Sequence, residues 1–135
     1  MTTHEAGKRV HESYIRAGGR AFISAFYDRL MDANDEIKAK FERVDMETQT
    51  DNLARAIVMS FLFVDQSHQT AARTMEKVRE SHSKNNLDIP PQLYDAWLDC
   101  LIDTVAELDP QADEELLEDW RSVMQVSINH IRGGY

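Results

Sequence analysis

The chain has 135 residues, enough for one domain with a sizeable core and too few for two, so we expect a single domain over residues 1–135. Its formal charge of −9 and isoelectric point near 4.9 argue against nucleic acid or an anionic membrane surface as a partner. The chain has no apolar run of about 18 residues and no apolar leader, and its one cysteine allows no intrachain disulfide, so the sequence predicts a soluble, cytoplasmic protein.

Glycine and proline are scarce, and helix-forming residues fill the stretches between them, so the sequence predicts an all-α fold. We expect a first helix over residues 5–17, with Val10, Tyr14 and Ile15 facing inward. The Gly18-Gly19 doublet ends this helix and marks a corner.

The second expected helix, residues 20–34, has an inward stripe that contains a tyrosine. Its members are Phe22, Ile23, Phe26, Tyr27 and Leu30. Such a tyrosine usually packs its ring and finds a hydroxyl partner, and its alternative role is that of a donor aimed into a pocket. Asn34 or Asp35 is expected to cap a brief third helix that carries Phe41, before an irregular segment over residues 42–47.

A fourth helix is expected to begin at Thr48 or Thr50 and to end near Val64. One of its faces carries Gln49, Leu53, Ile57 and Val64. Gln49 also fits a plain surface position near the start of the helix. Nearly every residue from 56 to 64 is apolar, so we expect the helix to be buried almost all round.

The next helix, after a loop over residues 65–69, is expected to end at His82. Its inward stripe advances by four, three and four residues through Ala71, Met75, Val78 and His82. Asn85 and Asn86 are suited to ending a helix, and Ile89-Pro90-Pro91 forces an extended step. The sequence therefore presents one imidazole inward, beside a chain reversal.

Two long helices complete the chain, one over residues 91–108 and one from about residue 114. We place Trp97 and Trp120 in the core between them. Cys100 lies off the main stripe of its helix, so we expect it to face away from the core and assign it no role.

The five histidines are scattered and form no HxxxH pair, which argues against a multidentate protein metal site. A lone histidine on an apolar face is most often structural. A metal held by one histidine and a macrocycle is still allowed, which is the haem case. Haem needs an imidazole, an apolar slot, an aromatic wedge and a donor for O2, and the chain offers these as His82, Leu53 with Ile57, Phe41, and Tyr27 with Gln49.

In this order the landmarks resemble the globin family, specifically bacterial single-domain globins and the globin domain of flavohaemoglobins. The resemblance covers essentially the whole chain. It rests on FYDRL at residues 26–30, Phe41 in KAKF, Gln49-xxx-Leu53, His82, Tyr94 in PPQLY, Trp120 and the Gly18-Gly19 corner. It implies the globin fold, a three-on-three helical sandwich around a haem pocket.

The resemblance also implies the cofactor, haem b, and a role for each landmark. His82 would bind the iron, with its other ring nitrogen held by a carbonyl or side chain of the same helix. Phe41 would stack near the haem, while Tyr27 and Gln49 would donate hydrogen bonds to bound O2. The remaining positions would be Leu53 and Ile57 on the distal wall, Val78 and Ile89 on the proximal side, and Tyr94 against His82.

The chain departs from flavohaemoglobins in three respects. The spacing from Phe41 to Gln49 is slightly shorter and that from His82 to Tyr94 slightly longer, so we expect remodelled corner loops. The last residues, 132–135, lack the glutamate that completes the network around the proximal histidine in that group. The reductase domains are absent as well. The last two departures weaken the interpretation as a dedicated enzyme.

The leading hypothesis is a haem protein that reversibly binds O2, and also NO or CO, for oxygen transport, storage, scavenging or sensing. An alternative is an NO dioxygenase or peroxidase-like enzyme that uses an external reductase. A further alternative is a haem-free, globin-like signalling module. A monomer and a homodimer fit the sequence equally well.

Overall fold

The computed structural model describes residues 3–64, 68–83 and 87–135, which form seven α-helices and no strand. The helices are α1 (Thr3–Ala17), α2 (Arg20–Ala33), α3 (Asp35–Lys40), α4 (Met46–Phe63), α5 (Gln69–Ser81), α6 (Leu93–Leu108) and α7 (Glu114–Arg132). The all-α prediction is confirmed. The expected loop residues 65–67 and the expected helix stop at Asn85 and Asn86 lie outside the described residues. Within the described ranges, no helix is both long enough and apolar enough to cross a bilayer.

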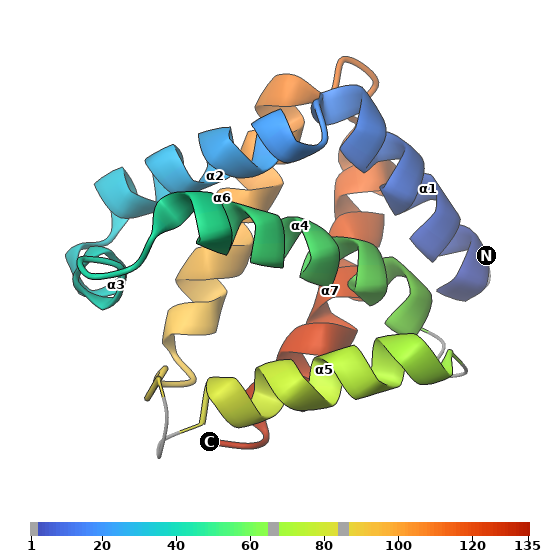
Figure 1. Cartoon of the computed structure of the whole chain (residues 1–135). Helices are drawn as coiled ribbons and strands as arrows, with labels where there is room; N and C mark the ends of the chain where they lie inside the picture. Colours follow the sequence, from blue (N-terminus) through green and yellow to red (C-terminus); the bar gives the residue numbers. More distant parts are fainter. Residues whose placement is uncertain (1–2, 65–67, 84–86) are drawn as a thin grey trace.

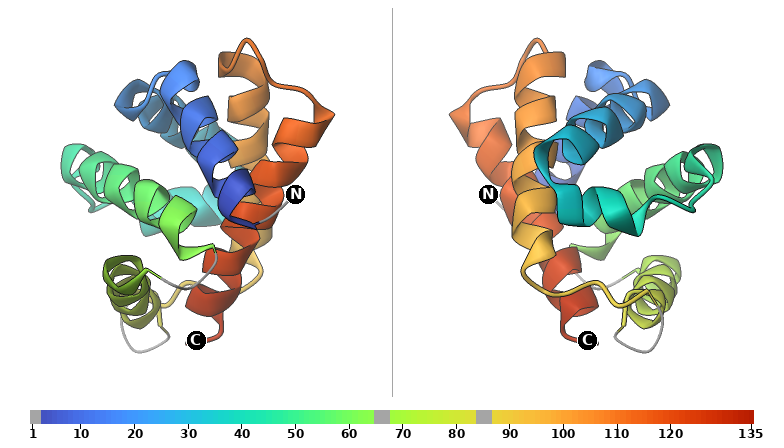
Figure 2. Two further views of the ribbon diagram at one scale, coloured as in Figure 1. Left: turned by 90° about the vertical axis from the view of Figure 1, so that its right-hand side faces the viewer. Right: turned by 90° about the vertical axis from the view of Figure 1, so that its left-hand side faces the viewer.

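The helices form two layers of three, joined in part by the short α3 (Figure 1). In one layer α4 packs against both α1 and α5, and in the other α6 packs against both α2 and α7. Across the layers α7 contacts α1, α4 and α5, and α2 contacts α4. Figure 2 shows the green helices α4 and α5 on one side and the orange and red helices α6 and α7 on the other. This is the three-on-three sandwich that the family resemblance implied.

The corner between α1 and α2 depends on two glycines. Gly18 and Gly19 have φ angles of 121° and 61°, which residues with a side chain rarely adopt. The Gly19 N–H donates to the Tyr14 carbonyl at 3.0 Å and so closes the end of α1. The chain can therefore turn directly from one layer into the other.

Side chains cap the starts of several helices, and one of these caps corrects the sequence analysis. Asn34 and Asp113 each accept a hydrogen bond from the backbone N–H three residues later. At α4 the cap is Asp45, whereas the prediction named Thr48 or Thr50. The Thr48 hydroxyl donates to the Asp45 carboxylate at 2.9 Å, and Thr50 lies inside the first turns. Aspartate and threonine are both good N-cap residues, so the sequence alone did not show at which of them α4 begins.

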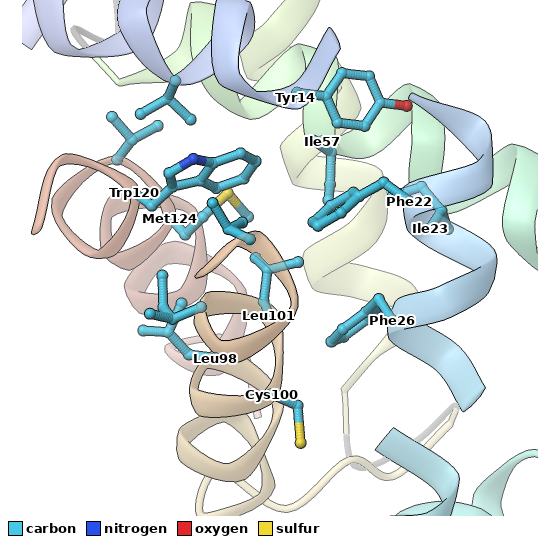
Figure 3. Packing of buried hydrophobic residues seen from close by; sticks show 14 of the residues in the cluster. Tyr14, Phe22, Ile23, Phe26, Ile57, Leu98, Cys100, Leu101, Trp120 and Met124 are labelled. Carbon is cyan, nitrogen blue, oxygen red and sulfur yellow. The ribbon is translucent and has the colours of Figure 1, made fainter. Parts of the chain in front are cut away.

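Trp120 lies at the centre of the core and has no exposed surface (Figure 3). Its ring lies 5.9 Å from that of Phe22 and 5.8 Å from that of Phe61, between centroids. Its Nε1–H donates to the Ser13 hydroxyl at 2.9 Å. Helices α1, α2, α4 and α7 therefore meet around one side chain.

Four other side chains lie differently from expectation. Trp97 is half-buried and contacts Phe26 of α2 edge-on, at 5.2 Å between centroids. Ile15 is 63% exposed, because the buried face of α1 lies on the Val10 side of the helix. Leu62 is 40% exposed, because neighbouring helices cover only part of α4. Cys100 is buried, since α6 packs against both α2 and α7, and this burial raises the pKa of its thiol.

Candidate functional site

A cavity of about 620 Å³ lies between the layers, with walls from helices α2 to α7. All nine residues that the sequence analysis assigned to a haem site line this cavity. They are Tyr27, Phe41, Gln49, Leu53, Ile57, Val78, His82, Ile89 and Tyr94. The fold thus brings together residues from four helices and two connecting segments at one place.

His82 reaches the cavity from the end of α5, where it is the last residue with helical geometry. Its Nδ1 lies 2.9 Å from the Val78 carbonyl and 3.0 Å from the Ser81 hydroxyl. A carbonyl can only accept, so Nδ1 carries the proton and Nε2 keeps its lone pair. Burial lowers the pKa of His82, and the bond to the Val78 carbonyl opposes this only in part. At pH 7 the ring is therefore neutral and has one nitrogen available to a metal.

Tyr27 and Gln49 meet in another part of the cavity wall, contributed by α2 and α4. The Gln49 amide Nε2 donates to the Tyr27 hydroxyl oxygen at 3.2 Å. Burial raises the pKa of Tyr27 to about 12, although the bond from Gln49 acts in the opposite direction. The phenol therefore keeps its proton, and since its oxygen accepts from Gln49, its O–H remains available to donate.

Phe41 packs against Tyr27 from the end of α3. Its ring centroid lies 5.4 Å from that of Tyr27, with an angle of 66° between the ring planes. This edge-to-face arrangement is a favourable geometry for two aromatic rings. It holds the Tyr27 ring in one orientation at the cavity wall.

Tyr94 lies near His82, in the first turn of α6. The two ring centroids are 6.5 Å apart, and the planes are inclined by 34°. Burial raises the pKa of Tyr94 to about 12, so its hydroxyl stays protonated and neutral. Ile89 lines the cavity beside them, and its N–H donates to the His82 carbonyl at 3.3 Å.

Three basic residues that the sequence analysis did not single out also line the cavity: Lys40, Arg55 and Lys77. All three are exposed residues, so their charged ends lie at the mouth. No aspartate or glutamate of the described residues lines the cavity, although the chain carries 24 acidic and 15 basic residues. The three residues lie on different helices, so no sequence motif joins them. The sequence contained only one indication of their position, which is that Arg55 and Lys77 are adjacent in the chain to inward-facing residues.

The cavity fits haem in three respects. Its walls are largely aliphatic and aromatic, as a porphyrin requires. His82 supplies one neutral imidazole, the single protein ligand with which a macrocycle such as a porphyrin can hold an iron. No group of three or more possible protein ligands to a metal occurs among the described residues. The basic residues at the mouth match the two carboxylates that haem carries on one edge.

Comparisons with known proteins agree with this geometry. The model of the family described as Globin matches residues 24–131. The chain is similar to a crystal structure of protein PA3967 from Pseudomonas aeruginosa PAO1, described as structurally highly homologous to a human hemoglobin. The two share 34% identity and a TM-score of 0.87, over 96% of this chain and 98% of the other. No curated protein matches the sequence.

Proposed function

The chain belongs to the globin family, and from this premise we propose that it acts as a single globin domain that holds haem b and reversibly binds O2, and also NO and CO. One observation carries the proposal. A neutral imidazole from α5 and a protonated phenol supported by an amide face the same largely apolar cavity, which carries cations and no carboxylate among the described residues.

Each group has a defined task in the proposal. The His82 Nε2 would hold the iron, and the Val78 carbonyl keeps the ring in the tautomer that leaves Nε2 free. Lys40, Arg55 and Lys77 pair with the carboxylates at the mouth. Haem, when bound, supplies the iron that takes up diatomic gases.

Tyr27 would set the preference among these gases. Its neutral O–H would donate more strongly to O2, which takes up partial negative charge, than to CO. Gln49 donates to the Tyr27 oxygen, which polarises the phenol and makes its O–H a better donor. The pair therefore supports O2 binding more than CO binding.

The test is an absorbance spectrum of the recombinant protein as purified, after reduction, and after addition of O2. We expect a Soret band that shifts at both steps. His82→Gly should lose haem, and added imidazole should restore the band by occupying the vacated position. His11→Gly is the matched control, since His11 is exposed on α1 and does not line the cavity.

Two results would overturn the proposal. One is a wild-type protein that takes up no haem even when haem is added, which would leave a helical interaction module. The other is a His82→Gly variant that holds haem as the wild type does and shows no response to imidazole. If haem binds, NO consumption with and without an added reductase separates a gas carrier from an enzyme that depends on an external electron donor.

A further inference from the structure

Asp88 has an unusual backbone conformation just after the helix that carries His82. Its φ angle is 53°, and no other described residue apart from glycine has a positive φ. Asparagine and aspartate adopt this left-handed conformation more readily than other residues with a side chain, but it still costs free energy. Something in the surroundings of Asp88 must therefore stabilise it.

The conformation lets the chain return onto the last turn of α5. The N–H groups of residues 87, 88 and 89 donate to the carbonyls of Ser81, Ser83 and His82, at 3.0, 2.9 and 3.3 Å. The Ser81 and His82 carbonyls lie at the end of α5, where backbone acceptors lack partners within the helix. The three bonds therefore fix the backbone from which the His82 side chain projects.

Two side chains from distant parts of the chain hold Asp88 in place. The Lys40 ammonium, at the end of α3, donates to the Asp88 carbonyl at 2.7 Å. The Tyr135 hydroxyl, in the segment after α7, donates to the Asp88 carboxylate at 2.7 Å. Lys40 also lines the cavity, so one of these bonds joins a residue of the cavity wall on α3 to the segment after His82.

The segment after α7 lies beside α5, near the end marked C in Figure 1, and side-chain bonds hold it there. The Arg79 guanidinium donates to the carbonyls of His130 and Gly133, at 3.2 and 3.4 Å. A Cβ atom on Gly134 would lie 2.5 Å from the Arg79 side chain, so a larger residue there would force that side chain to shift. Tyr135 is thus brought to Asp88 by a second set of contacts, independent of Lys40.

We propose that Asp88 is a positioning residue, which joins α3 and the segment after α7 to the last turn of α5 and thereby fixes the orientation of the His82 imidazole in the cavity. Its effect on haem retention rests on the proposed function. Its effect on the His82 ring does not, because the contacts that carry it belong to the protein alone. The two effects can therefore be measured separately.

The first experiment uses the haem-free protein and nitrogen-15 NMR of the histidine side chains. Wild type should show His82 in the single tautomer with the proton on Nδ1. Asp88→Ala, which loses both the carboxylate and the tolerance of a positive φ, should show a mixture of tautomers. Asp88→Asn keeps a side-chain oxygen for Tyr135 and tolerates this φ, so it should restore the wild-type tautomer.

The second experiment measures haem loss to an acceptor protein. We expect Asp88→Ala to lose haem about three- to tenfold faster than wild type, because it lacks the hydrogen bond from Tyr135 to the Asp88 carboxylate. Tyr135→Phe should accelerate loss to a smaller extent, and it tests the proposal if Asp88→Ala does not fold. For Lys40→Met the His82 tautomer is the deciding measurement, because the proposed function also pairs Lys40 with the haem carboxylates. Lys38→Met is the control for Lys40→Met, because it removes the same charge from an exposed position of α3.

A wild-type His82 tautomer in Asp88→Ala, Tyr135→Phe and Lys40→Met, with a wild-type haem-loss rate in the first two, would overturn the inference. A mixed His82 tautomer that Asp88→Asn fails to restore would also overturn it. A protein that binds no haem would refute the proposed function alone, because the NMR experiment would still report on Asp88.

Discussion

At the scale of the residue, the function depends on which groups donate and which accept. Tyr27 is 3% exposed, and its hydroxyl oxygen accepts a hydrogen bond from the Gln49 amide. A buried hydroxyl that accepts one bond still has its own proton to place, and leaving it without an acceptor costs free energy. A hydrogen bond from the Tyr27 O–H to a ligand in the cavity is therefore favourable.

Replacing Tyr27 by phenylalanine should speed O2 release while changing CO release much less. A hydrogen bond to a group with partial negative charge contributes about 1.5–3 kcal/mol, so the rate of O2 dissociation should rise on the order of 10- to 100-fold. Laser photolysis and stopped-flow measurements of O2 and CO release give both rates. Tyr14→Phe is the control, because Tyr14 is buried in the core and does not line the cavity. An unchanged O2 dissociation rate in Tyr27→Phe would remove the distal role of this residue.

At the scale of the element, the crossing of α1 and α4 decides how closely the helices of one layer approach. Gly7 of α1 lies against the backbone of α4, and a Cβ atom there would be 2.6 Å from the Phe61 carbonyl oxygen and 3.2 Å from a Val64 methyl group. Because the nearest atom belongs to a helical backbone, it cannot move aside as a side-chain end could. The crossing thus requires glycine inside a helix, where glycine is otherwise unfavourable.

Gly7→Ala tests this crossing, because the close approach of the helices decides whether the change raises or lowers the free energy of unfolding. At an open helical position the change would raise the free energy of unfolding by about 1 kcal/mol. Here we expect it to lower that free energy by about 1–3 kcal/mol, because the helices must separate. Urea unfolding followed by circular dichroism measures the difference. Lys8→Ala, at the exposed neighbouring position, should change stability by less than about 0.5 kcal/mol. A stabilised Gly7→Ala protein would show that α1 and α4 do not cross as closely as described.

At the scale of the whole molecule, one buried carboxylate connects the first helix to the last two. The Asp109 carboxylate accepts hydrogen bonds from Ser13 at 2.6 Å and from Arg16 at 3.0 Å through two nitrogens. Ser13 in turn accepts from Trp120 at the centre of the core. Burial alone would raise the pKa of Asp109, but the bonds from Arg16, Ser13 and the Gln111 N–H outweigh it, and the pKa is lowered.

Asp109→Asn should lower the free energy of unfolding by about 3 kcal/mol, since it leaves the Arg16 charge without its partner. The unfolded chain takes up the Asp109 proton near pH 3.8 and the folded chain only at lower pH. The stability that Asp109 contributes is therefore present above about pH 3.8 and is lost as the pH falls through the lowered pKa. In urea unfolding between pH 3 and pH 7, the free energy of unfolding should fall less with decreasing pH in Asp109→Asn than in wild type.

The control for this prediction is Asp99→Asn. Asp99 pairs with Arg121 at 3.1 Å, but the Asp99 side chain is 65% exposed and that of Arg121 is 42% exposed, so its loss should cost less than about 1 kcal/mol. Equal effects of the two substitutions would contradict the role of Asp109.

Much of the fold and of the candidate site was predictable because helices repeat with a regular period. The stripe from Ala71 to His82 already placed the imidazole among apolar side chains, and the stripe of α2 did the same for Tyr27. The sequence missed Lys40 and Asp88, whose importance comes from a bond between segments 48 residues apart. It also misplaced Ile15, because an apolar side chain at the edge of a stripe does not reveal whether a neighbouring helix covers it.

The sequence by itself determined the helical class, most inward faces and the nine cavity residues, since these depend on spacing along a single helix and on the family resemblance. Only the tertiary structure decided the hydrogen-bond partner of each buried polar group, the basic mouth of the cavity and the central place of Ser13 and Asp109. The physical reason is that burial and hydrogen bonding are properties of pairs of elements. A local pattern defines the face that a helix presents, and the packing of the layers defines what that face meets.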